Sequence, residues 1–217
     1  MDWENDQKYI EDGMKDTGAV NIVAGMILDY RAFDTLGESF VLFTAVTCVL
    51  VLLTDFKGKK IIDVGTGAGF PGMVISLLLG TDVDLLDSTN KKLNVINDFG
   101  NELVHTINER VEEYSKKHRE NYDIVIARAV APLNILSELC LPLVKVGGYF
   151  IAMKGSDGEA ELDLASKAID KLGGKLVKTD KHSLPNGDIR INFLIRKDKV
   201  TNEKYPRSFG EIKNKPL

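Results

Sequence analysis

The stretch from Ile61 to Gly72, with the sequence IIDVGTGAGFPG, constrains the fold of this chain more than any other. An apolar run leads into a turn that contains Gly65, Gly67 and Gly69, and residues 71–79 then form a mostly apolar segment that predicts a helix. Glycines allow the chain to turn sharply and let its backbone approach a ligand closely. A strand, a glycine-rich loop and a helix in this order predict the first unit of a nucleotide-binding α/β fold.

A second predicted strand, Val83–Leu86, supports this interpretation because Asp87 ends it, 22 residues after Gly65. An acid at that place can accept hydrogen bonds from both ribose hydroxyls of an adenosine group. The glycine spacing differs from the Gly-x-Gly-x-x-Gly of most dinucleotide sites, which disfavours a nicotinamide dehydrogenase. The alternative is that Asp87 or Ser88 only caps the following helix. We favour the nucleoside site because the loop and the acid occur together.

Length and composition predict one substantial soluble domain, since the chain has 217 residues and ordinary apolar and charged fractions. Cys48 and Cys140 both stand in apolar surroundings without metal-ligand spacing, so we interpret them as reduced core residues of a cytosolic protein. The three histidines are scattered, and no metal site is predicted.

Positive charge gathers near the C-terminus, where Arg196 and the residues after it include seven basic and three acidic side chains. Such a segment could meet a nucleic-acid phosphate backbone. The alternative is a solvated, frayed terminus, and charge alone favours that alternative.

The N-terminal part differs from the rest, because Ser39–Thr54 contains no charged residue. We predict a helix there, about 24 Å long, which is shorter than the ~30 Å hydrocarbon core of a membrane. The acidic residues before it do not fit a signal peptide. The motifs Asn21–Val23, Asp29–Glu38 and Val41–Val46 make residues 17–53 similar to a fragment of membrane subunits of multisubunit cation/proton antiporters and membrane-bound hydrogenases.

From residue 57 onward, predicted strands alternate with predicted helices, which favours a mostly parallel sheet covered on both faces. The predicted strands cover residues 60–64, 82–86, 104–108, 122–127, 147–153, 175–181 and 189–196, and the predicted helices cover residues 71–79, 89–100, 132–145 and 157–172. The turn-like sequence at 184–188 predicts an antiparallel hairpin between the last two strands. This α/β pattern predicts the seven-stranded Rossmann-like methyltransferase sheet.

A series of motifs carries a more specific resemblance. They are Asp63–Gly72, Leu85–Ser88 with Asn90–Lys92, Arg110–Glu113, Ala127–Leu133, Gly147–Gly155 and Tyr205–Leu217. In this order and spacing, residues 60–217 resemble the bacterial 16S rRNA guanine-N7 methyltransferase family, also called the glucose-inhibited division protein B family. The resemblance implies an enzyme that uses S-adenosylmethionine and acts on rRNA of the small ribosomal subunit.

The resemblance also implies a set of cofactor-binding residues: Gly65, Gly67, Gly69, Phe70, Asp87, Ser88, Val111, Glu112 and Arg128. In this set Asp87 takes the ribose, and Val111 and Glu112 lie beside the adenine. Arg128 is expected beside the methyl group and the target base. Independently, Arg128 follows a predicted strand, and ligands of open α/β sheets lie beyond the carboxyl ends of the strands. Its alternative role is a structural ion pair.

The segment after the fourth predicted strand limits which atom of a base the enzyme can methylate. It reads RAVAPL from Arg128, without the Asn/Asp-Pro-Pro-aromatic motif of amine methylation and without a cysteine nucleophile for pyrimidine C5. Guanine N7 is a target that requires neither feature, because it offers a lone pair and has no proton to remove. We therefore predict that Arg128 binds and orients the base and is neither an acid nor a base.

The predicted RNA-binding residues are Lys154, Lys204, Arg207, Lys213 and Lys215. For Lys154 a solvated cation is an equal alternative. Two departures from the family pattern stand out: Ser208–Glu211 is less basic than expected, and antiporter-like sequence replaces the family's N-terminal helical segment. In the family those helices cover the sheet and help shape the substrate cleft, so the second departure falls on the RNA half of the site.

We predict three regions: an atypical N-terminal segment at 1–56, a methyltransferase domain at 57–200 and a basic tail at 201–217. We expect a cytoplasmic monomer that acts on 16S rRNA, with membrane association through residues 17–54 as a possibility. Two alternatives stay open. One is a membrane-associated fusion or interaction protein with reduced or absent RNA methylation, and the other is a small-molecule methyltransferase.

Overall fold

The computed structural model describes residues 58–99, 102–184 and 187–217. Contacts divide the chain into two units, Met1–Thr44 and Ala45–Leu217, and every described residue belongs to the second unit. The helix predicted at 39–54 and the antiporter-like segment therefore lie outside the described residues.

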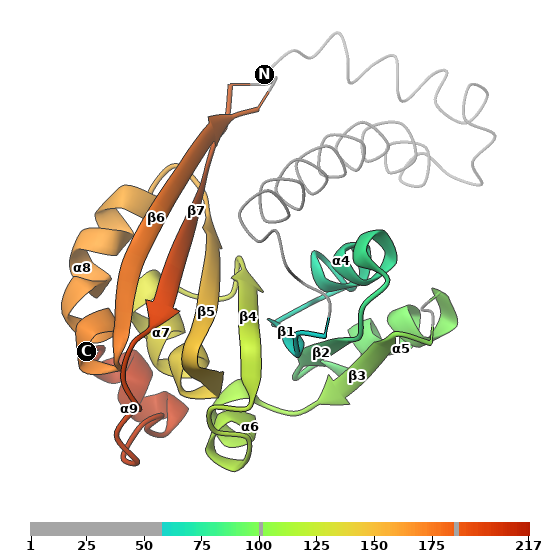
Figure 1. Ribbon diagram of the computed structural model, residues 1–217, viewed down its shortest axis with the longest axis horizontal. Helices are drawn as coiled ribbons and strands as arrows, with labels where there is room; N and C mark the ends of the chain where they lie inside the picture. The colour runs from blue at the N-terminus through green and yellow to red at the C-terminus, as the bar shows by residue number, and fades with distance from the viewer. Residues whose placement is uncertain (1–57, 100–101, 185–186) are drawn as a thin grey trace, which may run out of the picture. The chain divides into compact units, whose positions relative to one another are not determined.

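A seven-stranded sheet with the order β3-β2-β1-β4-β5-β7-β6 forms the centre of the described unit (Figure 1). The strands are β1 (Ile61–Val64), β2 (Val83–Asp87), β3 (Val104–Asn108), β4 (Tyr122–Arg128), β5 (Val144–Lys154), β6 (Gly174–Ser183) and β7 (Ile189–Lys197). Strands β1 to β5 pair in parallel, and β7 is antiparallel to both of its neighbours. The predicted sheet and the predicted hairpin of the last two strands are confirmed.

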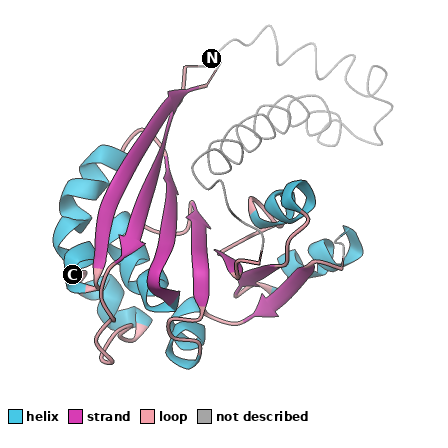
Figure 2. Ribbon diagram, in the orientation of Figure 1, coloured by secondary structure: helices cyan, strands magenta, loops and turns pink. Residues whose placement is uncertain are grey.

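Helices cover both faces of this sheet (Figure 2). They are α4 (Gly72–Leu79), α5 (Asn90–Phe99), α6 (Val111–Lys117), α7 (Leu133–Cys140), the 3-10 turn η1 (Leu141–Leu143), α8 (Gly158–Lys171) and α9 (Phe209–Asn214). One buried cluster joins the sheet to α4 and α5, and the other joins it to α6, α7, α8 and α9. Across the described ranges, no helix combines the length and the apolar character needed to cross a membrane.

Strand β1 shows how the sequence places the site. All of its residues are buried, as expected for a parallel strand with helices on both faces. Because side chains alternate along a strand, Ile62 and Val64 join the cluster with α7, whereas Ile61 joins the cluster with α4 and α5. Asp63 has the same parity as Ile61, and its carboxylate lies under the glycine-rich loop, where it meets Thr66.

The structure differs from the predicted helices in three places. The helix predicted at 132–145 ends at Cys140, because the chain tightens into η1 around Pro142 and Val144 already begins β5. The helices α6 and α9 are absent from the sequence prediction, since both are shorter than the windows in which helical periodicity is visible.

The C-terminal residues pack on the domain instead of forming a loose tail. Thr201 and Ile212 are fully buried, and Tyr205 is 3% exposed. The Arg119 guanidinium donates hydrogen bonds to the carbonyl oxygens of Thr201, at 2.6 Å, and of Tyr205. The segment 201–217 is thus part of the described unit.

Candidate functional site

The glycine-rich loop leaves β1 and is held against β2. The N–H groups of Gly65 and Thr66 both donate to the Leu86 carbonyl, at 2.8 and 3.1 Å. Gly65 has a φ of +71°, and a Cβ there would lie 2.4 Å from Cγ2 of Val130. Gly67 has a φ of +62°, and no described atom lies within 4 Å of the position that a Cβ would occupy there. Position 65 therefore requires glycine, because its φ is positive and because a Cβ would clash with Val130.

Asp63 fixes both ends of this loop, a role that the sequence does not suggest. Its Oδ2 atom accepts a hydrogen bond from the Thr66 hydroxyl at 2.7 Å and from the Gly72 N–H at 2.9 Å. Burial raises the pKa of Asp63 to about 6, against the smaller lowering effects of these two donors and of the Arg128 charge. Among the described residues, Oδ1 has no hydrogen-bond partner.

Asp87 ends β2 and is only 7% exposed. One carboxylate oxygen accepts the Gly67 N–H at 3.0 Å, and the other accepts the Thr89 N–H at 2.8 Å. The ammonium of Lys92 lies 3.8 Å away. The acid therefore stabilises the turn before α5, as the alternative interpretation expects, and it also links that turn to the glycine-rich loop.

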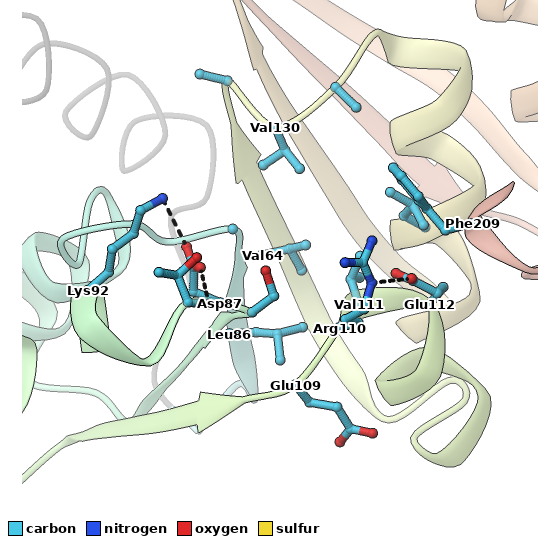
Figure 3. Close-up of a pocket in the computed structure, with 16 residues that line it drawn as sticks. Val64, Leu86, Asp87, Lys92, Glu109, Arg110, Val111, Glu112, Val130 and Phe209 are labelled. Atoms are coloured by element: carbon cyan, nitrogen blue, oxygen red, sulfur yellow. Dashed lines mark hydrogen bonds and ion pairs between the residues drawn. The ribbon is translucent and has the colours of Figure 1, made fainter. Parts of the chain in front are cut away.

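A cavity of about 300 Å³ opens at the carboxyl ends of β1, β2 and β4 (Figure 3). Its lining residues are Val64, Gly65, Leu86, Asp87, Ser88, Thr89, Lys92, Glu109, Arg110, Val111, Glu112, Ala129, Val130, Ala131, Leu139 and Phe209. Of the predicted cofactor residues, Gly65, Asp87, Ser88, Val111 and Glu112 are in this set, and Gly67, Gly69, Phe70 and Arg128 are not. The volume falls at the lower end of the range for small-molecule sites, about 300–1,000 Å³.

The wall opposite Asp87 is built from α6 and α9 (Figure 3). Glu112 is 4% exposed and accepts a hydrogen bond from Nε of Arg110 at 2.7 Å. The Arg110 guanidinium carbon lies 5.0 Å from the centre of the Phe209 ring. Phe209 is missing from the residues predicted from the sequence, although Ser208 and Glu211 form a capping box, a pattern that is visible in a sequence and that marks the start of α9.

Arg128 lies at the end of β4, half-buried, on the same face as Asp63. No hydrogen bond or ion pair holds its guanidinium within the part of the chain that the structure describes. The next residue, Ala129, has a φ of +53°, a conformation that costs a non-glycine residue about 1–3 kcal/mol. Such strained residues gather at functional sites, and Ala129 itself lines the cavity.

The five predicted RNA-binding residues separate into two groups. The ammonium of Lys154 lies 2.7 Å from the Glu161 carboxylate and donates to the Ala131 carbonyl at 2.5 Å, and Lys154 is 8% exposed. The Arg207 guanidinium donates twice to Glu138, at 2.8 and 2.6 Å, and its backbone N–H donates a third hydrogen bond at 3.0 Å. Both cations therefore hold the fold together. The exposed members are Lys204, Lys213 and Lys215.

Two family models match the chain. The model described as rRNA small subunit methyltransferase G matches residues 42–188. The MbhE model, which describes one of the subunits of MBH, matches residues 4–63 and agrees with the resemblance drawn from residues 17–53.

Similar proteins extend over most of the chain. The ribosomal RNA small subunit methyltransferase G of Clostridium novyi (strain NT) is 46% identical over 169 residues, which cover 74% of this chain and 70% of that protein. The protein of the same name from Lactobacillus acidophilus is 44% identical over 184 residues, which cover 81% of this chain and 77% of that protein.

Solved structures agree on the fold. A putative S-adenosylmethionine-dependent methyltransferase from Listeria monocytogenes superposes with a TM-score of 0.58 at 11% identity, covering 76% of this chain and 100% of that chain. A mutant 16S rRNA (adenine(1408)-N(1))-methyltransferase from Catenulisporales acidiphilia, solved with the cosubstrate SAM, gives 0.53 at 11% identity, with 67% and 87% covered. These matches confirm the predicted methyltransferase-type fold.

Proposed function

The chain belongs to the rRNA small subunit methyltransferase G family, and we propose that it transfers a methyl group from S-adenosylmethionine to N7 of a guanine in 16S rRNA. One observation carries the proposal: a single cavity at the carboxyl ends of β1, β2 and β4 brings together Gly65, Asp87 and Glu112. These residues come from separate elements, and ligands of open α/β sheets bind at this edge.

The residues around the cavity fit S-adenosylmethionine. Each oxygen of the Asp87 carboxylate accepts one backbone N–H and keeps a lone pair for a ribose hydroxyl. Gly65 lets the backbone pass close to the ligand, and Val111 and Glu112 offer an apolar surface and an acceptor to the adenine. The bound cofactor supplies an electrophilic methyl group on a sulfonium.

The protein's task in this reaction is to position the base. Guanine N7 has an in-plane lone pair and carries no proton, so no general base is needed. Rate enhancement comes from holding N7 in line with the methyl group at about 3–3.5 Å. The Arg128 guanidinium is available to donate to guanine O6 or to a phosphate. It stays away from N7, where positive charge develops, and thus orients the substrate without exchanging a proton.

In this proposal the exposed cations of the C-terminal segment bind the RNA backbone. Lys204, Lys213 and Lys215 are exposed and can contact phosphates, which bind by releasing counterions. Lys154 and Arg207, although predicted for this role, are left out because their charges are already paired with Glu161 and Glu138.

Calorimetric titration with S-adenosylhomocysteine tests the cofactor site. Asp87→Asn is expected to weaken binding by about 10-fold to 150-fold, since hydrogen bonds to a charged group contribute about 1.5–3 kcal/mol. Asp82→Asn is the matched control, because its carboxylate is 72% exposed and pairs only with His105 among the described residues. Equal dissociation constants for wild type and Asp87→Asn would contradict the proposal. Labelled transfer to 16S rRNA, with small amines and acids as competing acceptors, separates the RNA enzyme from a small-molecule methyltransferase.

We further propose that the chain acts as a cytoplasmic monomer. Membrane attachment through residues 17–54, or docking of that segment in an antiporter complex, is the alternative that the MbhE match supports. Cell fractionation distinguishes the two, because the unattached protein stays in the supernatant and the attached protein moves to the membrane pellet. Sedimentation of the protein in the supernatant then tests whether it is a monomer.

A further inference from the structure

The C-terminal segment holds Phe209 in a fixed position at the cavity. Ile212, one turn further along α9, is fully buried in the cluster with α7. Just before α9, Arg207 pairs with Glu138, which is also fully buried. A capping box closes the first turn of the helix. Two anchors on α7 and a capped first turn therefore present a half-buried aromatic ring to the ligand site.

The surroundings of this ring have a distinct chemical character. Phe209 shares its end of the cavity with the apolar side chains of Val111 and Leu139 and with the buried acid Glu112. The Arg110 guanidinium lies against the ring at 5.0 Å, within the range of a cation–π interaction. The charged pair Asp87 and Lys92 lies on the opposite side (Figure 3). A flat apolar group with a polar N–H edge fits this end, and a ribose fits the other.

We propose that Phe209 is a cofactor-binding residue whose ring packs against the adenine of S-adenosylmethionine, an inference that rests on the proposed function. Aromatic rings pack on purines through offset stacking or edge contacts, which add to the burial of apolar area. The Arg110 guanidinium holds the ring in place from the start of α6. The C-terminal segment thereby acts as a wall of the cofactor pocket as well as a support for the exposed lysines.

Calorimetric titration with S-adenosylhomocysteine tests this contact. Phe209→Ala is expected to raise the dissociation constant about tenfold, which corresponds to about 1.4 kcal/mol, and Phe209→Tyr is expected to keep it within about twofold. Val200→Ala removes a smaller apolar group from a 68% exposed position outside the cavity lining and serves as the control. An unchanged dissociation constant for Phe209→Ala overturns the inference. If wild type itself binds no S-adenosylhomocysteine, the proposed function fails and this inference fails with it.

A second measurement covers the case in which Phe209→Ala does not fold. The chain has one tryptophan, Trp3, so Phe209→Trp combined with Trp3→Phe gives a protein whose emission reports on position 209 alone. Titration with S-adenosylhomocysteine is expected to change this emission with saturation at the calorimetric dissociation constant, whereas methionine, which lacks the purine, leaves it unchanged at the same concentrations. No change on saturation with S-adenosylhomocysteine overturns the inference, and so does an equal change with methionine.

Discussion

Gly65→Ala is expected to lower the free energy of unfolding by about 2–5 kcal/mol, the sum of two costs. At the observed φ of +71°, an L-residue costs about 1–2 kcal/mol relative to glycine. The new Cβ would lie 2.4 Å from Cγ2 of Val130, so the chain after β4 must move, at a cost of about 1–3 kcal/mol. Gly67→Ala carries only the first cost, because no described atom lies within 4 Å of its Cβ position.

Urea denaturation of four variants separates the two costs. They are Gly65→Ala, Gly67→Ala, Val130→Ala and the double variant Gly65→Ala/Val130→Ala. Val130 is 37% exposed, so its truncation alone should cost about 1 kcal/mol or less. In the double variant the clash disappears. The double variant should therefore be about 1–3 kcal/mol more stable than the sum of the two single effects predicts. The steric argument is wrong if Gly65→Ala lowers the free energy of unfolding no more than Gly67→Ala does. It is also wrong if adding Val130→Ala to Gly65→Ala recovers no stability.

Three further predictions concern buried and exposed charges. The folded pKa of Asp63, about 6, lies above its ordinary 3.8, so the folded state binds the proton more tightly and loses stability as pH rises between these values. Relative to Asp63→Asn, urea denaturation should show a fall of about 3 kcal/mol from pH 3.8 to above pH 6, and a constant difference would contradict this. Arg207→Ala leaves Glu138 buried without its partner and should cost about 3–5 kcal/mol, whereas Lys213→Ala should stay within about 0.5 kcal/mol; equal thermal shifts would refute the structural role. Replacing Lys213 and Lys215 together should reduce the slope of log affinity for rRNA against log salt by about 1.4–1.8, and an unchanged slope would remove them from the RNA site.

The sequence is informative where the chemistry is local. The glycine-rich loop, the acid Asp87 and the alternation of strands and helices each follow from neighbouring residues, and the sheet that they predict is confirmed. Asp87 shows the limit of such reasoning. The ligand-binding and the structural interpretations look exclusive in the sequence, yet the carboxylate both holds the turn at Thr89 and lines the cavity.

Long-range pairs cannot be predicted in this way, because their partners are far apart in the chain. Lys154 and Arg207 look like surface cations in a basic context, but they pair with Glu161 and Glu138, and no local pattern marks those pairs. The sequence does not predict Phe209 as a site residue, because the positive charge of the C-terminal segment gives no information about where this aromatic ring lies. Its capping box is visible in the sequence, but its arrival at the cavity depends on how α9 packs against α7.

The most direct test of the central claim is transfer of labelled methyl from S-adenosylmethionine to small-subunit rRNA taken from cells that lack this modification. Wild type and Arg128→Ala are compared, and the labelled position is mapped. We predict label at N7 of one guanine with wild type, and its loss with Arg128→Ala while S-adenosylhomocysteine still binds. Bound cofactor without any transfer to rRNA by wild type, or label at another atom, would contradict the account.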